Sequence, residues 1–99
     1  MGDKIIKDAE IAMVNAATYA TGYLEKKHNA DVDEIIKSFL QEQGSKIKPK
    51  VRLYSVAAIN EIMKMKLNRE NRGKTDKQLI QSFMKTIPLI INRIDEDSD

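Results

Sequence analysis

Cysteine is absent from the 99-residue sequence. The chain can therefore form no disulfide framework, no thiolate nucleophile and no cysteine-ligated zinc or iron–sulfur site. Long apolar runs are absent too, because the longest spans about four residues, whereas a membrane-spanning helix needs roughly 20. The first residues lack the apolar region of a signal peptide and the hydroxyl residue of a myristoylation signal. We therefore expect a cytoplasmic protein without a membrane anchor.

Motifs of catalysis and of metal binding are missing as well. There is no glycine-rich phosphate loop, no paired-histidine ligand spacing and no nucleophile in a hydrolase motif. His28 is the only histidine, and its position beside lysines at the expected end of a helix favours a helix-terminus role. Asp31, Asp33 and Glu34 cluster where a helix should begin, which is where acids are stabilising. We predict a protein that is not an enzyme, with no catalytic residue, no cofactor and no metal site.

Hydrophobic residues make up 41% of the sequence, which is enough for the core of one small domain. Their spacing is helical, and no convincing strand signal or repeat is present. We predict an all-α fold, a small single-domain bundle of four helices over residues 1–94, followed by an acidic disordered tail over residues 95–99. The connections near Asn29, Gly44 and Gly73 are short, so consecutive helices should pack as antiparallel neighbours.

The third predicted helix, residues 51–68, carries apolar residues around most of its circumference. Its two apolar flanks consist of Val56, Ile59, Met63 and Leu67 and of Tyr54, Ala58, Ile62 and Met65. Two such flanks need two sets of covering helices. We therefore expect the third helix to be central in the bundle.

Local signals place the other helices. The first helix is expected over residues 3–27. Asp31 with Glu34 predicts the N-terminus of the second helix, and Thr75 with Gln78 predicts that of the fourth. The apolar pattern of the fourth helix continues through Pro88 to residue 94, which favours one helix kinked at Pro88. The alternative is a new helix that begins at this proline.

Basic residues concentrate in the middle of the chain, where residues 46–85 hold 11 basic and 3 acidic groups. The candidate phosphate contacts of this basic block, residues 46–77, are Lys46, Lys48, Lys50, Arg52, Lys64, Lys66, Arg69, Arg72, Lys74 and Lys77. Four of them crowd the start of the third helix, where the helix dipole disfavours cations and where backbone N–H groups can bind an anion. Tyr54 and Phe83 are expected in the core, so aromatic groups for stacking on bases are few. The block is either a nucleic-acid surface that contacts phosphate or an ordinary solvated surface.

The first helix has a second face with little charge. Ile11, Val14, Thr18 and Gly22 follow one another with helical spacing opposite the expected core face. We take these four residues, with Leu89 on the fourth helix, as the candidate partner interface. Charged residues occur only near the ends of this face, at Lys7 and Glu25. Single apolar residues on a surface are common, so the alternative is a face without a partner.

Two functions follow from these patterns. The favoured one is a non-catalytic protein-interaction or regulatory module, which binds another protein or forms a homodimer through the first helix. The alternative is a nucleic-acid-binding protein that uses the basic block. No motif ties the sequence to a known family.

Overall fold

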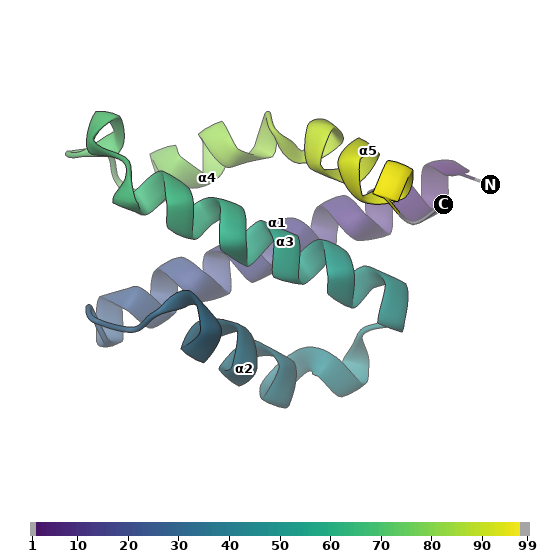
Figure 1. Ribbon diagram of the computed structural model, residues 1–99, viewed down its shortest axis with the longest axis horizontal. Coiled ribbons are helices and arrows are strands. Elements are labelled where there is room, and N and C mark those ends of the chain that lie inside the picture. The colour runs from purple at the N-terminus through teal and green to yellow at the C-terminus, as the bar shows by residue number, and fades with distance from the viewer. Residues whose placement is uncertain (1, 98–99) are drawn as a thin grey trace.

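Two long helices cross at the centre of the molecule, and three shorter helices flank them (Figure 1). The computed structural model describes the backbone of residues 2–97 and the side chains of residues 7–95. The helices are α1 (Gly2–Lys26), α2 (Val32–Gln43), α3 (Pro49–Leu67), α4 (Asp76–Met84) and α5 (Ile87–Asp97), with short 3-10 helices η1 (Gly44–Lys46) and η2 (Arg69–Asn71) before and after α3. The described backbone contains no strand, which confirms the all-α prediction. Within residues 2–97, no helix combines the length and the apolar character that spanning a membrane requires.

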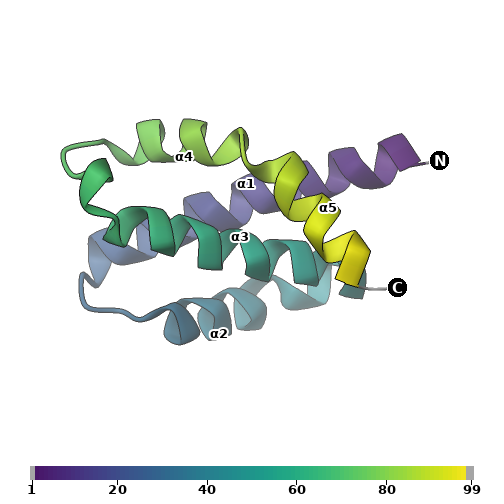
Figure 2. The same cartoon turned by 45° about the horizontal axis from the view of Figure 1, so that its top comes forward.

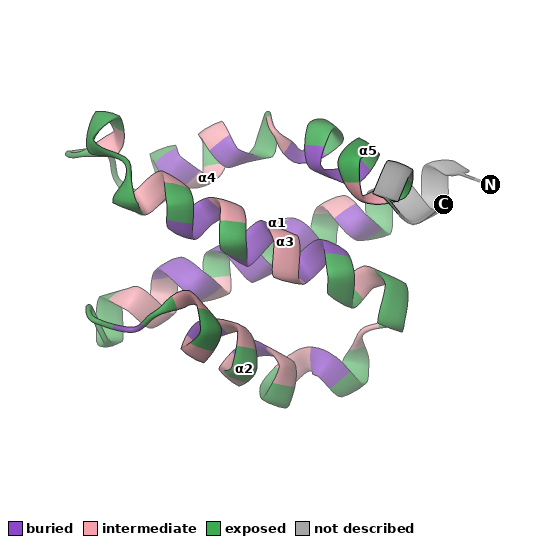
Figure 3. Cartoon of the chain, viewed as in Figure 1, coloured by how far each residue is buried: buried purple, intermediate pink, exposed green. Residues whose placement is uncertain are grey.

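Alanine side chains allow α1 and α3 to approach closely. Ala9, Ala16 and Ala20 on α1 and Ala58 on α3 are all buried. The contact between α1 and α3 is the most extensive contact between any two helices. Small side chains at a helix contact let the two backbones come nearer. Buried residues of the flanking helices lie on the sides that face this crossing (Figure 3).

Helix α3 contacts each of the other four α-helices, and so does α1. Helix α2 lies on one side of the crossed pair, and α4 and α5 lie on the other side (Figure 1). Ile59 and Ile62, one from each predicted flank of the third helix, are buried in the core. Leu67 was also predicted for a flank, but it is 81% exposed because α3 ends there and the chain turns away into η2.

The predicted fourth helix is two helices, so the expectation of one helix kinked at Pro88 was wrong. Proline has no N–H to donate to the carbonyl of Met84, and its ring would clash with that carbonyl in a continuous helix. Instead, the N–H and hydroxyl of Thr86 both donate to the carbonyl of Phe83, over 2.8 and 2.7 Å. Helix α5 then begins at Ile87, one residue before the start that the alternative prediction gave. It leaves the line of α4 and runs across toward the first half of α3 (Figure 2).

Both predicted helix starts are confirmed by side-chain caps. The Asp31 carboxylate accepts a hydrogen bond from the N–H of Glu34 over 2.8 Å at the start of α2. At the start of α4, the N–H of Gln78 donates to the Thr75 hydroxyl over 3.2 Å, and the N–H of Thr75 donates to the Gln78 side chain over 2.9 Å. This reciprocal pair satisfies backbone donors that a helix start would otherwise leave without partners.

A partly buried hydrogen bond joins α5 to α3. The Tyr54 hydroxyl, on a side chain that is 2% exposed, donates to Oδ1 of Asp95 over 2.6 Å. This hydrogen bond, together with burial, raises the pKa of Tyr54 to about 12. Helix α5 continues to Asp97 and so includes part of the segment 95–99 for which the sequence predicted an acidic disordered tail. Residues 98 and 99 of that segment lie outside the described residues.

Shortening a buried side chain at the centre of α3 should destabilise the fold strongly. We expect Ile62→Ala to lower the free energy of unfolding by about 2 to 5 kcal/mol, because it opens a cavity in a packed core. Leu67→Ala removes a side chain of similar size from the exposed end of the same helix and should cost less than about 0.5 kcal/mol. Urea unfolding of both variants measures the difference. Equal losses would contradict the central position of Ile62.

Tyr54→Phe should remove a pH dependence of stability. The folded-state pKa of about 12 lies above the ordinary value of 10.0, so the phenol stabilises the fold fully below pH 10, and this stabilisation is lost as the pH rises toward 12. We expect the variant to lose about 1 to 3 kcal/mol at pH 7. The difference between parent and variant in urea unfolding should shrink between pH 10 and 12. A constant difference over that range would contradict the assignment.

Candidate interaction surfaces

The ten candidate phosphate contacts divide between the two ends of α3. The start cluster consists of Lys46, Lys48, Lys50 and Arg52, in η1 and around the first turns of α3. The end cluster consists of Lys64, Lys66, Arg69, Arg72, Lys74 and Lys77, from the last turn of α3 to the first turn of α4. Helix α3 has 19 residues, so its ends are about 28 Å apart at 1.5 Å per residue. The fold therefore separates the basic block into two clusters.

Two of the ten basic residues have partners within the fold. Nε of Arg52 donates to the carbonyl of Gly44 over 2.9 Å and to that of Ile47 over 3.3 Å. Nζ of Lys66 lies 3.0 Å from Oδ1 of Asp76 and ties the end of α3 to the start of α4. Neither role could be predicted from the sequence, because each depends on how a turn folds back. Arg52 near the N-terminus of α3 therefore closes the turn between α2 and α3.

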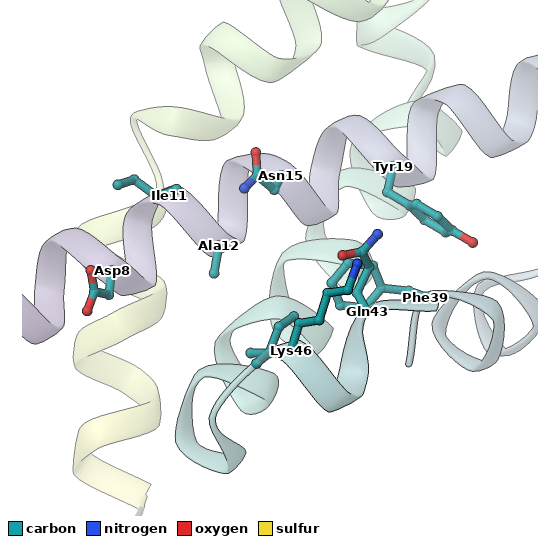
Figure 4. A pocket seen from close by; sticks show the side chains of 9 residues that line it. Asp8, Ile11, Ala12, Asn15, Tyr19, Phe39, Gln43 and Lys46 are labelled. Atoms are coloured by element: carbon teal, nitrogen blue, oxygen red, sulfur yellow. The ribbon is translucent and has the colours of Figure 1, made fainter. Parts of the chain in front are cut away.

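Lys48 and Lys50 are the exposed cations nearest the N-terminus of α3. Lys48 is the N-cap residue, but its side chain makes no capping hydrogen bond, and Pro49 follows in the first turn. Among the described side chains, neither lysine forms an ion pair. Lys46 lies apart from them and lines a hollow between α1 and α2 (Figure 4). The first turn of α3 therefore presents two cations beside backbone N–H groups.

The candidate partner interface on the first helix forms an outward crest, which we call the α1 crest (Ile11, Val14, Thr18 and Gly22). Ile11, Thr18 and Gly22 each line hollows on both sides of α1, toward α2 and toward α4 or α5. Val14 is half-buried and packs against the core. The Thr18 hydroxyl donates to the Val14 carbonyl over 2.9 Å, so its polarity is satisfied within the helix. The fold thus brings the four predicted residues onto one surface of low polarity.

An apolar hollow of about 360 Å³ lies between the α1 crest and the break between α4 and α5. Ile11 and Val14 line it from α1, and Met84, Ile87 and Pro88 line it from the other side. Ile11 is 61% exposed and Met84 is 49% exposed. The sequence did not indicate Met84 as a surface residue, because its spacing places it within the apolar pattern of the predicted fourth helix; in the structure it is the last residue of α4 and lines this hollow. Leu89 is 63% exposed on α5 but does not line this hollow.

The hollow on the other side of the α1 crest, of about 410 Å³, has mixed walls (Figure 4). Asp8 and Asn15 of α1 and Lys46 of η1 contribute polar groups. Tyr19 and Phe39 form its aromatic part, with ring centroids 5.4 Å apart in an edge-to-face arrangement. Within the described residues, no group of three acids or histidines is close enough to hold a metal ion.

The titratable groups with shifted pKa values near this side of α1 tie α2 to α1. The Tyr23 hydroxyl donates to Oε2 of Glu34 over 2.7 Å, and Nζ of Lys27 lies 2.8 Å from the same oxygen. The ion pair with Lys27 and the hydrogen bond from Tyr23 lower the pKa of Glu34, and the bond to Glu34 raises the pKa of Tyr23. The Tyr19 hydroxyl lies 2.6 Å from that of Ser38. These shifts follow from the packing of α2 against α1 and need no catalytic role to explain them.

Comparison of the chain with protein-family models, curated proteins and solved structures gave no match.

Proposed function

We propose that the chain is a non-catalytic protein-interaction or regulatory module that binds through the α1 crest. The supporting observation is the apolar hollow in which Ile11 and Val14 of α1 meet Met84 and Pro88 from the break between α4 and α5. Single exposed apolar residues are ordinary on protein surfaces. Here, residues from three separate helices form one apolar depression, and concave apolar surfaces with a polar rim are typical of binding sites.

The remaining exposed large apolar residues do not form such a surface. Leu53 and Leu67 are 58% and 81% exposed on α3, and neither lines any of the four hollows along α1. They serve as internal comparisons, because they have exposure similar to or greater than that of Ile11 without the concave surroundings. A partner that recognises shape as well as apolar area would distinguish Ile11 from them.

Charge on the α1 crest should abolish self-association. We expect the parent to sediment as a concentration-dependent dimer and Ile11→Glu with Thr18→Lys to sediment as a monomer, because charge on a desolvated contact is costly. Both positions are exposed, so the variant should keep the unfolding midpoint of the parent monomer. Leu53→Glu is the matched control and should remain dimeric. A monomeric parent at high concentration, or a dimer that survives the double change, would refute self-association through this surface.

The alternative function, nucleic-acid binding through phosphate, has one specific observation in its favour. Lys48 and Lys50 stand exposed beside the N-terminus of α3, the positive end of its dipole. Backbone N–H groups, a helix dipole and two cations together suit a phosphate group. The aromatic side chains in and just after the basic block do not favour base recognition, since Tyr54 and Phe83 are buried in the core. Binding of this kind would show little sequence preference.

Reversal of charge at Lys48 and Lys50 tests this alternative. If the start cluster binds phosphate, Lys48→Glu with Lys50→Glu should weaken binding to duplex probes of any sequence, and the log-log salt slope should fall by about 0.9 for each lost contact. Lys37→Glu with Lys85→Glu is the matched control, since it makes the same change in net charge at exposed sites on α2 and just after α4. Fluorescence titration at low salt measures all three proteins. Equal affinities, or no binding by the parent, would rule out this use of the cluster.

A further inference from the structure

We infer that the occupant of the α1 crest is a second copy of this chain, with the two α1 helices antiparallel about a two-fold axis that passes midway between Val14 and Thr18. This inference rests on the proposed function, because it names the partner and its orientation at the same surface. Three features of the described residues carry it: the spacing of the crest, an unexplained glycine and the distribution of charge.

The spacing of the crest matches a seam for one partner helix. Steps of four and three residues lead from Lys7 to Ile11, Val14 and Thr18, and further steps of four and three lead to Gly22 and Glu25. Such steps of four and three keep one line of a helix against a neighbouring helix over several turns. In an antiparallel two-fold pair centred at residue 16, position i faces position 32 − i of the partner. Val14 then faces the partner's Thr18, and the two-fold axis makes this pair twice.

Gly22 provides the complementary shape. A glycine inside a helix costs roughly 0.5 to 1 kcal/mol relative to alanine. Among the described residues, no backbone or packing requirement accounts for this glycine, because its φ is not positive and a Cβ built there would meet no atom within 4 Å. It lies instead in a hollow of about 480 Å³ beside Thr18 and Ile80. In the antiparallel register, the partner's Ile11 faces position 21, next to Gly22 in the lining of this hollow, so a large exposed side chain lies beside a position without a side chain.

Charge selects the antiparallel arrangement. Lys7 at one end of the seam faces the partner's Glu25 at the other end, and the two-fold axis makes this pair twice. An antiparallel pair also brings the α4 sides of the two copies together. Glu10, which lines the hollow near α5, therefore approaches the partner's Lys77, which lines the hollow beside Gly22. A parallel pair would oppose Lys7 with the partner's Lys7 and Glu25 with the partner's Glu25, which is repulsive.

Cysteine cross-linking tests the orientation, and the absence of native cysteine makes each introduced thiol unique. Lys7→Cys and Glu25→Cys proteins, mixed and mildly oxidised, should give mainly the disulfide that joins one to the other. Each protein oxidised alone should give little dimer, as should Lys37→Cys, an exposed control on α2. Predominant homodisulfides of Lys7→Cys or of Glu25→Cys, or yields equal to the control, would overturn the antiparallel register.

Charge exchange and a filled hollow give independent readouts by sedimentation. Lys7→Glu or Glu25→Lys alone should raise the dimer Kd about tenfold, because each replaces two attractive pairs with two repulsive ones, and the double variant should return to within about twofold of the parent. Gly22→Leu should abolish the dimer without lowering the unfolding midpoint, because its side chain points into open space. One outcome would overturn the register and leave the proposed function standing. In that outcome, Ile11→Glu with Thr18→Lys disrupts the dimer, but the Lys7→Glu, Glu25→Lys double variant does not restore the parent Kd and Gly22→Leu has no effect on the dimer. A parent that never dimerises would overturn both.

Discussion

The close contact between α1 and α3 is the interaction on which the rest of the structure depends. Both long helices carry buried alanines, whose small side chains allow close packing, and each of the two contacts all the other α-helices. Because alanine loses no side-chain rotamer freedom on folding, this contact has a low entropic cost. The flanking helices bring the larger buried residues, such as Phe39 of α2 and Phe83 of α4, against the sides of the crossing.

The position of the α1 crest is a consequence of that crossing. Helix α3 covers one side of α1, α2 covers a second, and α4 with α5 covers a third (Figures 1 and 2). One line along α1 remains uncovered, with a hollow on each side of it. Met84, the last residue of α4 before this break, lines one of these hollows together with Pro88. The proline that interrupts the predicted fourth helix therefore also lines a surface shared with α1.

Some basic side chains of this fold hold turns and helices together, and others make no such contact among the described side chains. Arg52 closes the turn before α3, Lys66 joins the start of α4, and Lys27 holds Glu34 against Tyr23. Lys48 and Lys50 have no such role among the described side chains. Arg52 and Lys50 look equivalent in sequence. Only the geometry of a cation near a helix N-terminus therefore distinguishes a structural contact from a candidate anion contact.

The sequence by itself determined α1, α2 and α3 and the starts of α2 and α4, because these depend on local physics. Spacing of apolar residues predicted α1, α2 and α3, and the caps at Asp31 and Thr75 form as their neighbours in sequence require. It also singled out Ile11, Val14, Thr18 and Gly22, since helical spacing alone places them on one face. Only the tertiary structure decided that α5 is a separate helix, that Leu67 is exposed, that Tyr54 reaches Asp95 and that Met84 joins the α1 crest at a hollow. The physical reason is that most of these features depend on groups that are far apart in the chain. The separate helix α5 depends on a competition between the apolar pattern, which favours one helix, and the missing N–H of Pro88, which interrupts it, and the spacing of apolar residues does not predict which of the two prevails.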